Sequence, residues 1–395
     1  MTDRPARIDL MRNIVSLDVD FTPNPVPPVA GSIKTWGLNN SGELGNGTTV
    51  SSNVPVALTA LSNVLAVAAS GSSGGGLNGT GGQDGNHSLA LLGDGTVRAW
   101  GANAFGELGD GTTVAESLPV AVSGLSNVTA IATGGTHSVA VLADGTVRTW
   151  GSNFSGELGD GTYVSSSVPV AVVGLSNVVA VSAGHQWTLA LLGDGTVRGW
   201  GNNVAGNLGD GQSNTTSPVP VTVTGLSNVV AIRAGSSHSL ALLGDGTVRA
   251  WGANSQGQLG DGTMTNRALP VAVSGLSGVV SIAAGTFHSL AVLSDGTLRG
   301  WGDNTNGQLG DGSTNNSSVP VAGQGISTAR SVSAGYQHSA AVLSNGTVWT
   351  WGDNFTGDLG NGSPYAAHVP TQVPGISGIR KIEAGYQYTV VLTVP

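Results

Sequence analysis

The sequence contains no cysteine and carries little charge. The lack of cysteine excludes disulfide bonds, thiolate metal sites and a cysteine nucleophile. Charged residues make up only 9% of the chain, so it is not a charge-rich disordered polymer. It has 64 glycines but no collagen-like pattern. The composition therefore predicts a globular protein rich in loops.

Basic residues are scarce and scattered. Lysine and arginine total 14, all but Lys34 and Lys381 being arginine, and the formal net charge is −9. Binding to nucleic acid or to an anionic membrane requires a concentrated positive surface, which this sequence lacks. We therefore expect no nucleic acid and no membrane as partner.

Long apolar runs and catalytic motifs are also missing. The N-terminal segment "MTDRPARIDLMRNIVSLDVDF" has no continuous apolar stretch of the kind found in secretory signals, and no run approaches a membrane span. By default we expect a cytoplasmic protein, with export only by another route. The chain has no nucleophile elbow, Walker loop or zinc-binding helix. We therefore expect no enzyme and no cofactor.

What the sequence does have is a repeat. The dipeptide Trp-Gly recurs with spacings of 64, 50, 50, 51, 50 and 50 residues, at Trp36, Trp100, Trp150, Trp200, Trp251, Trp301 and Trp351. A period near fifty, with short apolar runs between glycine-rich turns, is typical of a radial β architecture.

Each complete unit contains four predicted strands. In one unit they cover residues 178–183, 187–192, 196–200 and the region around 220–223. Asp194-Gly195 lies between the second and third strands, and Asp-Gly or Asn-Gly recurs there in the other complete units. Such a pair favours a two-residue type I′ hairpin. Each unit is therefore predicted to be an antiparallel blade.

The two ends of the chain complement each other. The first unit, from "GSIKTWG", has only a third and a fourth strand, and the last, "IRKIEAGYQYTVVLTV", has only a first and a second. Together they complete a blade and hide free sheet edges. We predict an all-β fold: residues 31–395 form a single seven-bladed β-propeller, with four antiparallel strands per blade and a blade shared between the N- and C-terminal strands.

The units, of the form "AGxxHSLALLxDGTVxxWGxNxxGxLGDG", resemble the repeats of the regulator of chromosome condensation family. The likeness covers about nine-tenths of the chain. It implies a seven-bladed propeller closed by strands from both termini. It implies no single function, because similar propellers are exchange factors for a nuclear GTPase, an ultraviolet photoreceptor, secreted β-lactamase inhibitors or modules of larger proteins. Near-identical repeats and scarce lysine indicate a bacterial origin.

Polar residues that recur at fixed repeat positions are interpreted as scaffold. Radial geometry keeps equivalent histidines of different blades apart, so we expect packing and hydrogen bonding rather than a metal site. The recurrent asparagine and aspartate suit turns. These residues are His87, His137, His238, His288 and His338, the asparagine of each "WGxN", and the aspartate of each "LGDG".

Residues that differ between units are the candidates for function. They lie mainly in the loops from first to second strand and from third to fourth, which share one face. We predict a partner-binding surface there, formed by Phe287, Tyr336, Tyr386, His185, Phe105, Phe154, Phe355, Leu77 and Asp84. Leu77 and Asp84 belong to a glycine-rich insertion at 70–86, which we expect to be mobile because it has almost no apolar residue.

Residues 1–30 are predicted to form an arm with a strand-like pattern and a proline-rich linker. Residues 13–21 alternate in polarity and can add to a sheet edge, which makes self-association one hypothesis. For the whole protein, we expect a non-enzymatic binding module or scaffold with a protein partner. Two alternatives stay open: a guanine-nucleotide exchange factor for a small GTPase, and a glycan-binding or enzyme-inhibitor propeller.

Overall fold

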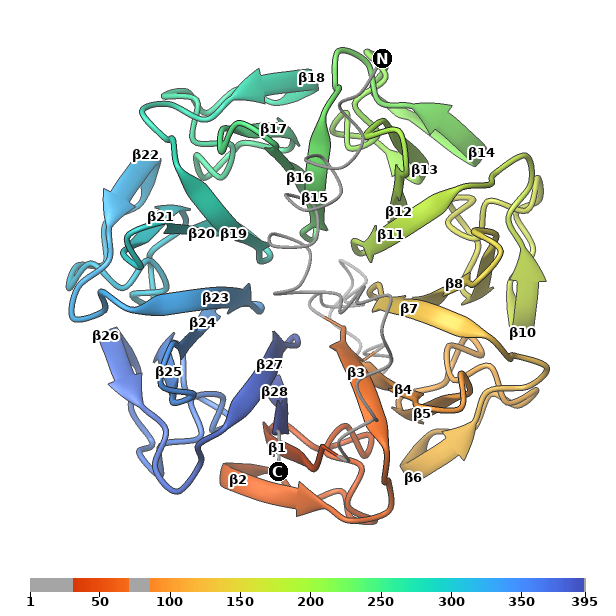
Figure 1. Ribbon diagram of the computed structural model, residues 1–395, viewed down its shortest axis with the longest axis horizontal. Helices are drawn as coiled ribbons and strands as arrows, with labels where there is room; N and C mark the ends of the chain where they lie inside the picture. Colours follow the sequence, from red (N-terminus) through yellow and green to blue (C-terminus); the bar gives the residue numbers. More distant parts are fainter. Residues whose placement is uncertain (1–30, 71–85, 394–395) are drawn as a thin grey trace, which may run out of the picture.

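The computed structural model describes residues 31–70 and 86–393. They form seven four-stranded antiparallel sheets, arranged as blades around a central axis (Figure 1). Within these residues, no helix has the length and apolar character needed to cross a membrane. The arm at 1–30 and the insertion residues 71–85, with Leu77 and Asp84, lie outside the described residues.

The strands fall into four sets by their place in the blade. The inner strands are β3 (Val64–Ala69), β7 (Val128–Thr133), β11 (Val178–Ala183), β15 (Val229–Ala234), β19 (Val279–Ala284), β23 (Ala329–Ala334) and β27 (Ile379–Ala384). The second strands are β4 (His87–Leu92), β8 (His137–Leu142), β12 (Trp187–Leu192), β16 (His238–Leu243), β20 (His288–Leu293), β24 (His338–Leu343) and β28 (Tyr388–Thr393).

The third strands are β1 (Ile33–Gly37), β5 (Val97–Gly101), β9 (Val147–Gly151), β13 (Val197–Asn203), β17 (Val248–Gly252), β21 (Leu298–Gly302) and β25 (Val348–Gly352). The outer strands are β2 (Ser52–Leu58), β6 (Glu116–Ala121), β10 (Ser166–Ala171), β14 (Thr215–Thr222), β18 (Arg267–Ala272), β22 (Ser317–Ala322) and β26 (Ala367–Gln372). Blade 1 is β3 to β6, blades 2 to 6 follow in chain order, and blade 7 contains β27, β28, β1 and β2.

Blade 7 closes the ring as predicted. Its strand order is β2-β1-β28-β27, so the first strand of the described chain pairs with the last. The β1–β28 register runs from Ile33 opposite Leu392 to Gly37 opposite Tyr388. The fold is therefore an all-β, seven-bladed propeller whose last blade combines strands from both ends.

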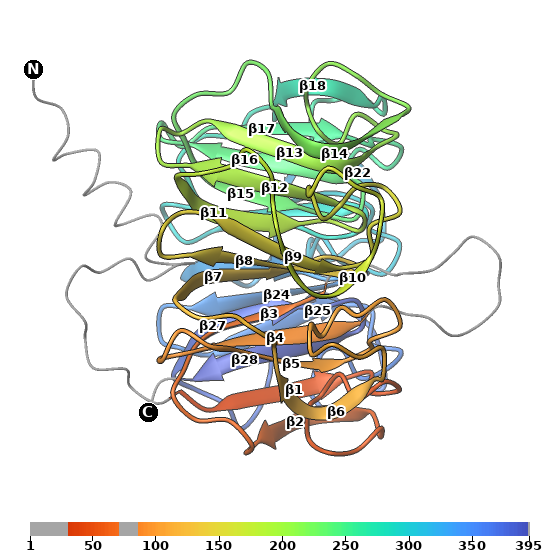
Figure 2. The same ribbon diagram turned by 90° about the vertical axis from the view of Figure 1, so that its right-hand side faces the viewer.

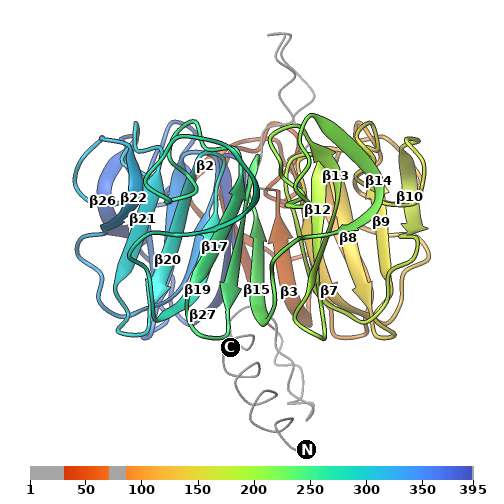
Figure 3. The same ribbon diagram turned by 90° about the horizontal axis from the view of Figure 1, so that it is seen from above.

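The disc has two distinct faces, and the strands run between them (Figures 2 and 3). Because neighbouring strands are antiparallel, the connections from first to second strand and from third to fourth strand emerge on one face, the loop face. The hairpins between second and third strands and the connections between blades form the other, the turn face.

The turn-face hairpins differ from the predicted type I′ geometry. Type I′ needs positive φ at two residues, but in the first hairpin Gly95 has φ 77° whereas Asp94 does not have a positive φ. Leu92 N–H donates to the Thr96 carbonyl, and Gly95 N–H donates to the Leu92 carbonyl. This is a three-residue loop, a type I turn followed by a left-handed glycine. The Asp94 carboxylate accepts from Thr96, so aspartate serves as a turn cap.

The core is divided into layers between adjacent blades. In one layer, Leu189 and Val197 of blade 3 pack with Ile232 and Trp251 of blade 4, all of them buried. The tryptophan of every Trp-Gly pair is fully buried in this way. Stacking of blades thus removes from water the apolar faces that one blade alone leaves exposed.

Candidate binding face and the buried polar belt

A belt of hydrogen bonds joins each blade to the next on the loop-face side. The indole N–H of Trp150 in blade 2 donates to the backbone carbonyl of Glu107 in blade 1 at 2.8 Å. The Ser138 hydroxyl donates to the same carbonyl, also at 2.8 Å. Every Trp-Gly tryptophan makes the equivalent bond to the preceding blade. The tryptophans are therefore structural.

The recurrent histidines extend this belt. The Nε2 atom of His87 lies 2.7 Å from the Ser138 hydroxyl oxygen, and His238 contacts Ser289 in the same way at 2.8 Å. Because Ser289 gives its proton to the carbonyl of Gln258, it accepts from the ring, which places the histidine proton on Nε2. The bonds thus run from His238 in blade 4 to Ser289 in blade 5 and back to the long loop of blade 4 at Gln258.

Burial keeps these rings neutral. Loss of hydration lowers the pKa of His137, His238 and His288 to about 3 and that of His338 to about 4. Within residues 31–70 and 86–393, no group of three or more histidine, aspartate or glutamate side chains is placed to hold a metal ion. Each ring instead contacts a hydroxyl of the neighbouring blade.

The other recurrent polar residues shape the long loops. The Asn103 side-chain oxygen accepts from the Leu108 N–H at 2.9 Å, and its amide donates to the Val114 carbonyl at 3.0 Å. The Asp110 carboxylate accepts the N–H and the hydroxyl of Thr112. These bonds turn the chain back toward the outer strand. These hydrogen bonds explain why asparagine and aspartate recur at the two positions, and no bound metal ion is needed to explain them.

One set of buried polar residues was not predicted from the sequence. The residue before each "LG" is Glu43, Glu107, Glu157, Asn207, Gln258, Gln308 or Asp358, and all seven are buried. In the glutamates and glutamines, a side-chain oxygen accepts a backbone N–H two residues earlier; for Glu107 the donor is Phe105. The interchange of acids with amides at one repeat position is the signal that could have identified a buried acceptor.

The acids of this set have strongly shifted pKa values. Burial raises the pKa of Glu107 to about 7 and that of Asp358 to about 8, and it also raises that of Glu157. Shifted carboxyls often mark catalytic sites. Here, amides occupy the same position in blades 3, 4 and 5, and the side chains cap a turn in the core. A structural role explains them.

Two pairs of aromatic rings lie on the loop face. Tyr336 and Tyr386, from neighbouring blades near the axis, are half-buried and have ring centroids 4.5 Å apart. Phe105 and Phe154, also from neighbouring blades but in the long loops, contact edge to face at 5.7 Å. The structure thus joins four of the predicted partner-binding residues into two pairs.

The remaining predicted residues are more dispersed. Phe287 is 36% exposed and Phe355 is 86% exposed. His185 is half-buried, burial lowers its pKa, and its backbone carbonyl accepts the Gly135 N–H from the preceding blade. His185 therefore lies at a blade junction and contributes less free surface than the exposed phenylalanines.

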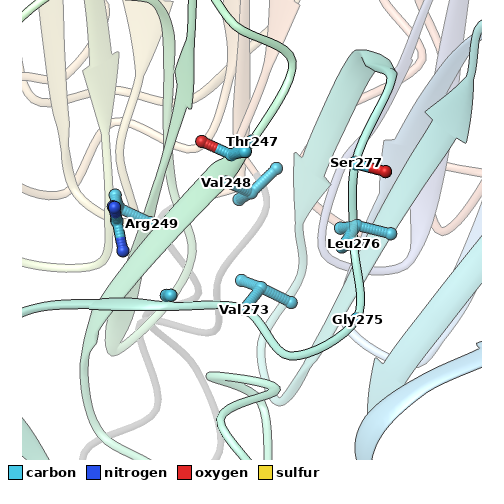
Figure 4. A pocket seen from close by; sticks show the side chains of 8 residues that line it. Thr247, Val248, Arg249, Val273, Gly275, Leu276 and Ser277 are labelled. Atoms are coloured by element: carbon cyan, nitrogen blue, oxygen red, sulfur yellow. The ribbon is translucent and has the colours of Figure 1, made fainter.

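The turn face carries a shallow depression of about 440 Å³ in blade 4 (Figure 4). It is lined by Thr247, Val248, Arg249, Ala272, Val273, Gly275, Leu276 and Ser277. Blade 2 has the same residue types at the matching positions, from Thr146 to Arg148 and from Ala171 to Ser176. Because its lining belongs to the common repeat, this depression marks scaffold rather than a specific site.

Comparison with known proteins agrees with the architecture. The model of the RCC1-like domain matches residues 81–391, and the model of the regulator of chromosome condensation (RCC1) repeat matches residues 30–74. The structure is similar to yeast RCC1 (Prp20) bound to Kap60, with 25% identity, a TM-score of 0.80, and coverage of 92% of this chain and 89% of that one.

Two further structures are similar. Prp20p from Saccharomyces cerevisiae, described with its binding properties to Gsp1p and histones, has 26% identity and a TM-score of 0.79, with 92% of each chain covered. Human WBSCR16, at 23% identity and a TM-score of 0.79, covers 92% of this chain and 99% of its own; it supports the fold alone. The family model spans most of the chain, and the protein belongs to the family of RCC1-like propeller domains.

Proposed function

We propose that the protein is a non-enzymatic binding module that engages a protein partner through the loop face. The observation that carries this proposal is a set of aromatic rings in the short loops of three consecutive blades. Tyr336 of blade 6 and Tyr386 of blade 7 form a pair, and Phe287 of blade 5 is exposed. The matching short loops elsewhere present Gly135, Ser236 and other small or polar residues. The scaffold therefore does not require aromatic rings there.

The comparisons support a protein partner. Prp20 has been described bound to Kap60 and with binding to Gsp1p and histones. Aromatic side chains are enriched at the centres of protein interfaces because they bury a large area with few rotatable bonds. The loop face combines such rings with variable loops, whereas the turn face repeats the same residues from blade to blade.

The test is capture of a partner from a lysate of the native source by the immobilised protein. The triple variant Phe287→Ala, Tyr336→Ala, Tyr386→Ala should lose the partner that the native protein retains. Arg249→Ala, on the turn face, is the control and should retain it. Equal capture by both variants would place the binding surface elsewhere.

A guanine-nucleotide exchange factor is the second candidate, supported to a comparable degree by the likeness to Prp20p, which was described with its binding to Gsp1p. This function predicts faster release of a fluorescent GDP from a small GTPase as the protein is added. Stoichiometric binding without faster release would favour the binding module. Retention on a glycan array without any protein capture would instead favour the lectin alternative.

A further inference from the structure

One position of the long loops divides the ring into two sectors. It lies eleven residues after the asparagine of each "WGxN". In ring order from blade 6 it holds Tyr365, Val50, Val114 and Val164, followed by Asn214, Thr265 and Asn315. Four consecutive blades thus carry an apolar or aromatic side chain, and the other three carry a polar one. We call the first four residues the apolar arc.

The scaffold does not require this division. The backbone carbonyls of Val50, Val114 and Val164 each accept a hydrogen bond from the asparagine that begins the loop. The carbonyl of Thr265 makes the same bond at 3.1 Å. The backbone role is thus independent of the side chain, and a polar residue fills the position equally well.

The side chains of the arc face water. Val50 is 72% exposed, Val114 63%, Val164 71% and Tyr365 77%. Two further exposed rings flank its ends, Phe355 in blade 6 and Phe154 in blade 2. The four arc residues come from four consecutive blades, so they form a row of separate apolar contacts along the long loops rather than one continuous patch. The long loops of blades 3 and 4 also expose Val204 and Met264, but at other positions of the loop.

Charge distribution indicates what kind of partner fits. In these four blades the loop side carries the partly exposed carboxylates Asp110, Glu116 and Asp160. Among the described residues, all lysines and arginines of the same blades come from the turn-face halves of strands, namely Lys34, Arg98, Arg148, Arg330, Arg380 and Lys381. The loop-face arginine Arg267 belongs to blade 4 and pairs with Asp261 at 2.8 Å. Within the described residues, the loop side of the four arc blades therefore carries carboxylates and no lysine or arginine, which suits a basic partner.

We propose that the apolar arc binds a basic amphipathic segment of a protein, in which apolar side chains alternate with lysine or arginine. The apolar side chains contact Val50, Val114, Val164 and Tyr365, and the cations face the carboxylates along the loops. This inference rests on the proposed function, because it specifies the partner chemistry and places contact on the outer part of the loop face.

Defined peptides test the chemistry directly. Binding is measured by fluorescence anisotropy with three short synthetic peptides: leucine alternating with lysine, leucine alternating with glutamate, and serine alternating with lysine. The leucine–lysine peptide should bind best, and its affinity should fall as salt increases. Similar binding of the leucine–glutamate peptide would overturn the charge argument, and similar binding of the serine–lysine peptide would overturn the apolar one.

Matched variants locate the site. Val50→Thr, Val114→Thr and Val164→Thr together keep the branched shape and copy the natural residue of blade 4, Thr265. They should weaken binding of the leucine–lysine peptide by about tenfold or more. The control Thr265→Val, in the polar sector, should leave the affinity unchanged. Unchanged binding by the triple variant overturns the proposal.

The same variants also distinguish this proposal from self-association through the arc and from failure of the proposed binding function. If the variant at Val50, Val114 and Val164 differs from the native protein in its mass in solution, the arc contacts a second copy and the proposal is wrong. If it still captures the native partner while the variant at Phe287, Tyr336 and Tyr386 does not, the proposed function stands and the arc is not its site. If neither native protein nor variants capture a partner, while the peptide binding depends on the three valines, the arc inference stands and the broader function fails.

Discussion

The Tyr388 hydroxyl donates a 2.6 Å hydrogen bond to the backbone carbonyl of His87, which joins blade 7, where the two ends of the chain pair, to blade 1. The same oxygen accepts from the Ser70 N–H and the Ser88 hydroxyl, each at 3.1 Å. Histidine makes one bond to the next blade at this repeat position, so tyrosine provides a more extensive connection at the closure. The described ring is thus joined by side chains as well as by β1–β28 pairing.

We predict that Tyr388→Phe destabilises the protein by about 1–3 kcal/mol, because it removes three buried hydrogen bonds between blade 7 and blade 1. Denaturant unfolding measures the change. Tyr365→Phe is the matched control, since that side chain is 77% exposed and the free energy of unfolding should hardly change. Equal effects of the two substitutions would contradict a special role of the closure hydroxyl.

The buried acid of blade 1 predicts an unusual pH dependence. The folded protein raises the pKa of Glu107 from 4.5 to about 7, so the folded state holds this proton more tightly than the unfolded state. Its contribution to stability is therefore fully present below pH 4.5 and is lost as pH rises through 7.

Glu107→Gln should remove this loss, because the amide that serves in Gln258 and Gln308 does not ionise. We expect a gain of about 1–3 kcal/mol at pH 8 and little gain at pH 4. Unfolding free energies at both pH values measure it, with Glu116→Gln as the control on the surface. A gain of the same size at both pH values would show that ionisation is not the cause.

The repeat made most of the architecture predictable. The bounds predicted for β11 and β12 are those observed, because apolar patterning and flanking glycines define both strands locally. The hairpin prediction was wrong in turn type, since Asp-Gly suits both a type I′ turn and the last two residues of a type I turn with a left-handed glycine. The choice depends on which strand residues pair, which the dipeptide alone does not define.

Contacts between repeats were less accessible from sequence. A hydrogen-bonding role for the recurrent histidines was expected, but the partner of His87 is Ser138, in the next blade. The angle and spacing between blades determine that contact. The arc at Val50, Val114 and Val164 was not recognised, because valine in a loop looks ordinary until its exposure is known. Glu107 was missed because its own loop does not mark it as buried; only the interchange of acids with amides between repeats does.

The histidine belt predicts acid sensitivity. The folded pKa of His288 is lowered from 6.5 to about 3, so its contribution to stability is present above pH 6.5 and is lost as pH falls toward 3. His288→Gln should reduce the slope of unfolding free energy against pH, between pH 4 and 6, by about 1.4 kcal/mol per pH unit. Trp187→His, which adds a histidine at the same position of blade 3, should steepen it. Parallel curves for all three proteins would contradict the assignment.

Among the described residues, Glu107 Oε1 is buried without a hydrogen-bond partner. In blade 2 the equivalent oxygen of Glu157 accepts from the Ser152 hydroxyl at 2.7 Å, whereas blade 1 has Ala102 where blade 2 has Ser152. A buried acceptor without a donor costs stability, and the neighbouring blade shows a side chain that supplies one.

Ala102→Ser should therefore stabilise the protein by about 0.5–1.5 kcal/mol, and Ser152→Ala should destabilise it by a similar amount. Both are measured by denaturant unfolding at pH 7. The double variant, which moves the hydroxyl from blade 2 to blade 1, should be close to the native protein because the two sites are separate. A destabilising Ala102→Ser would mean that blade 1 lacks the space for this hydroxyl, and the equivalence of the two blades at this position would be wrong.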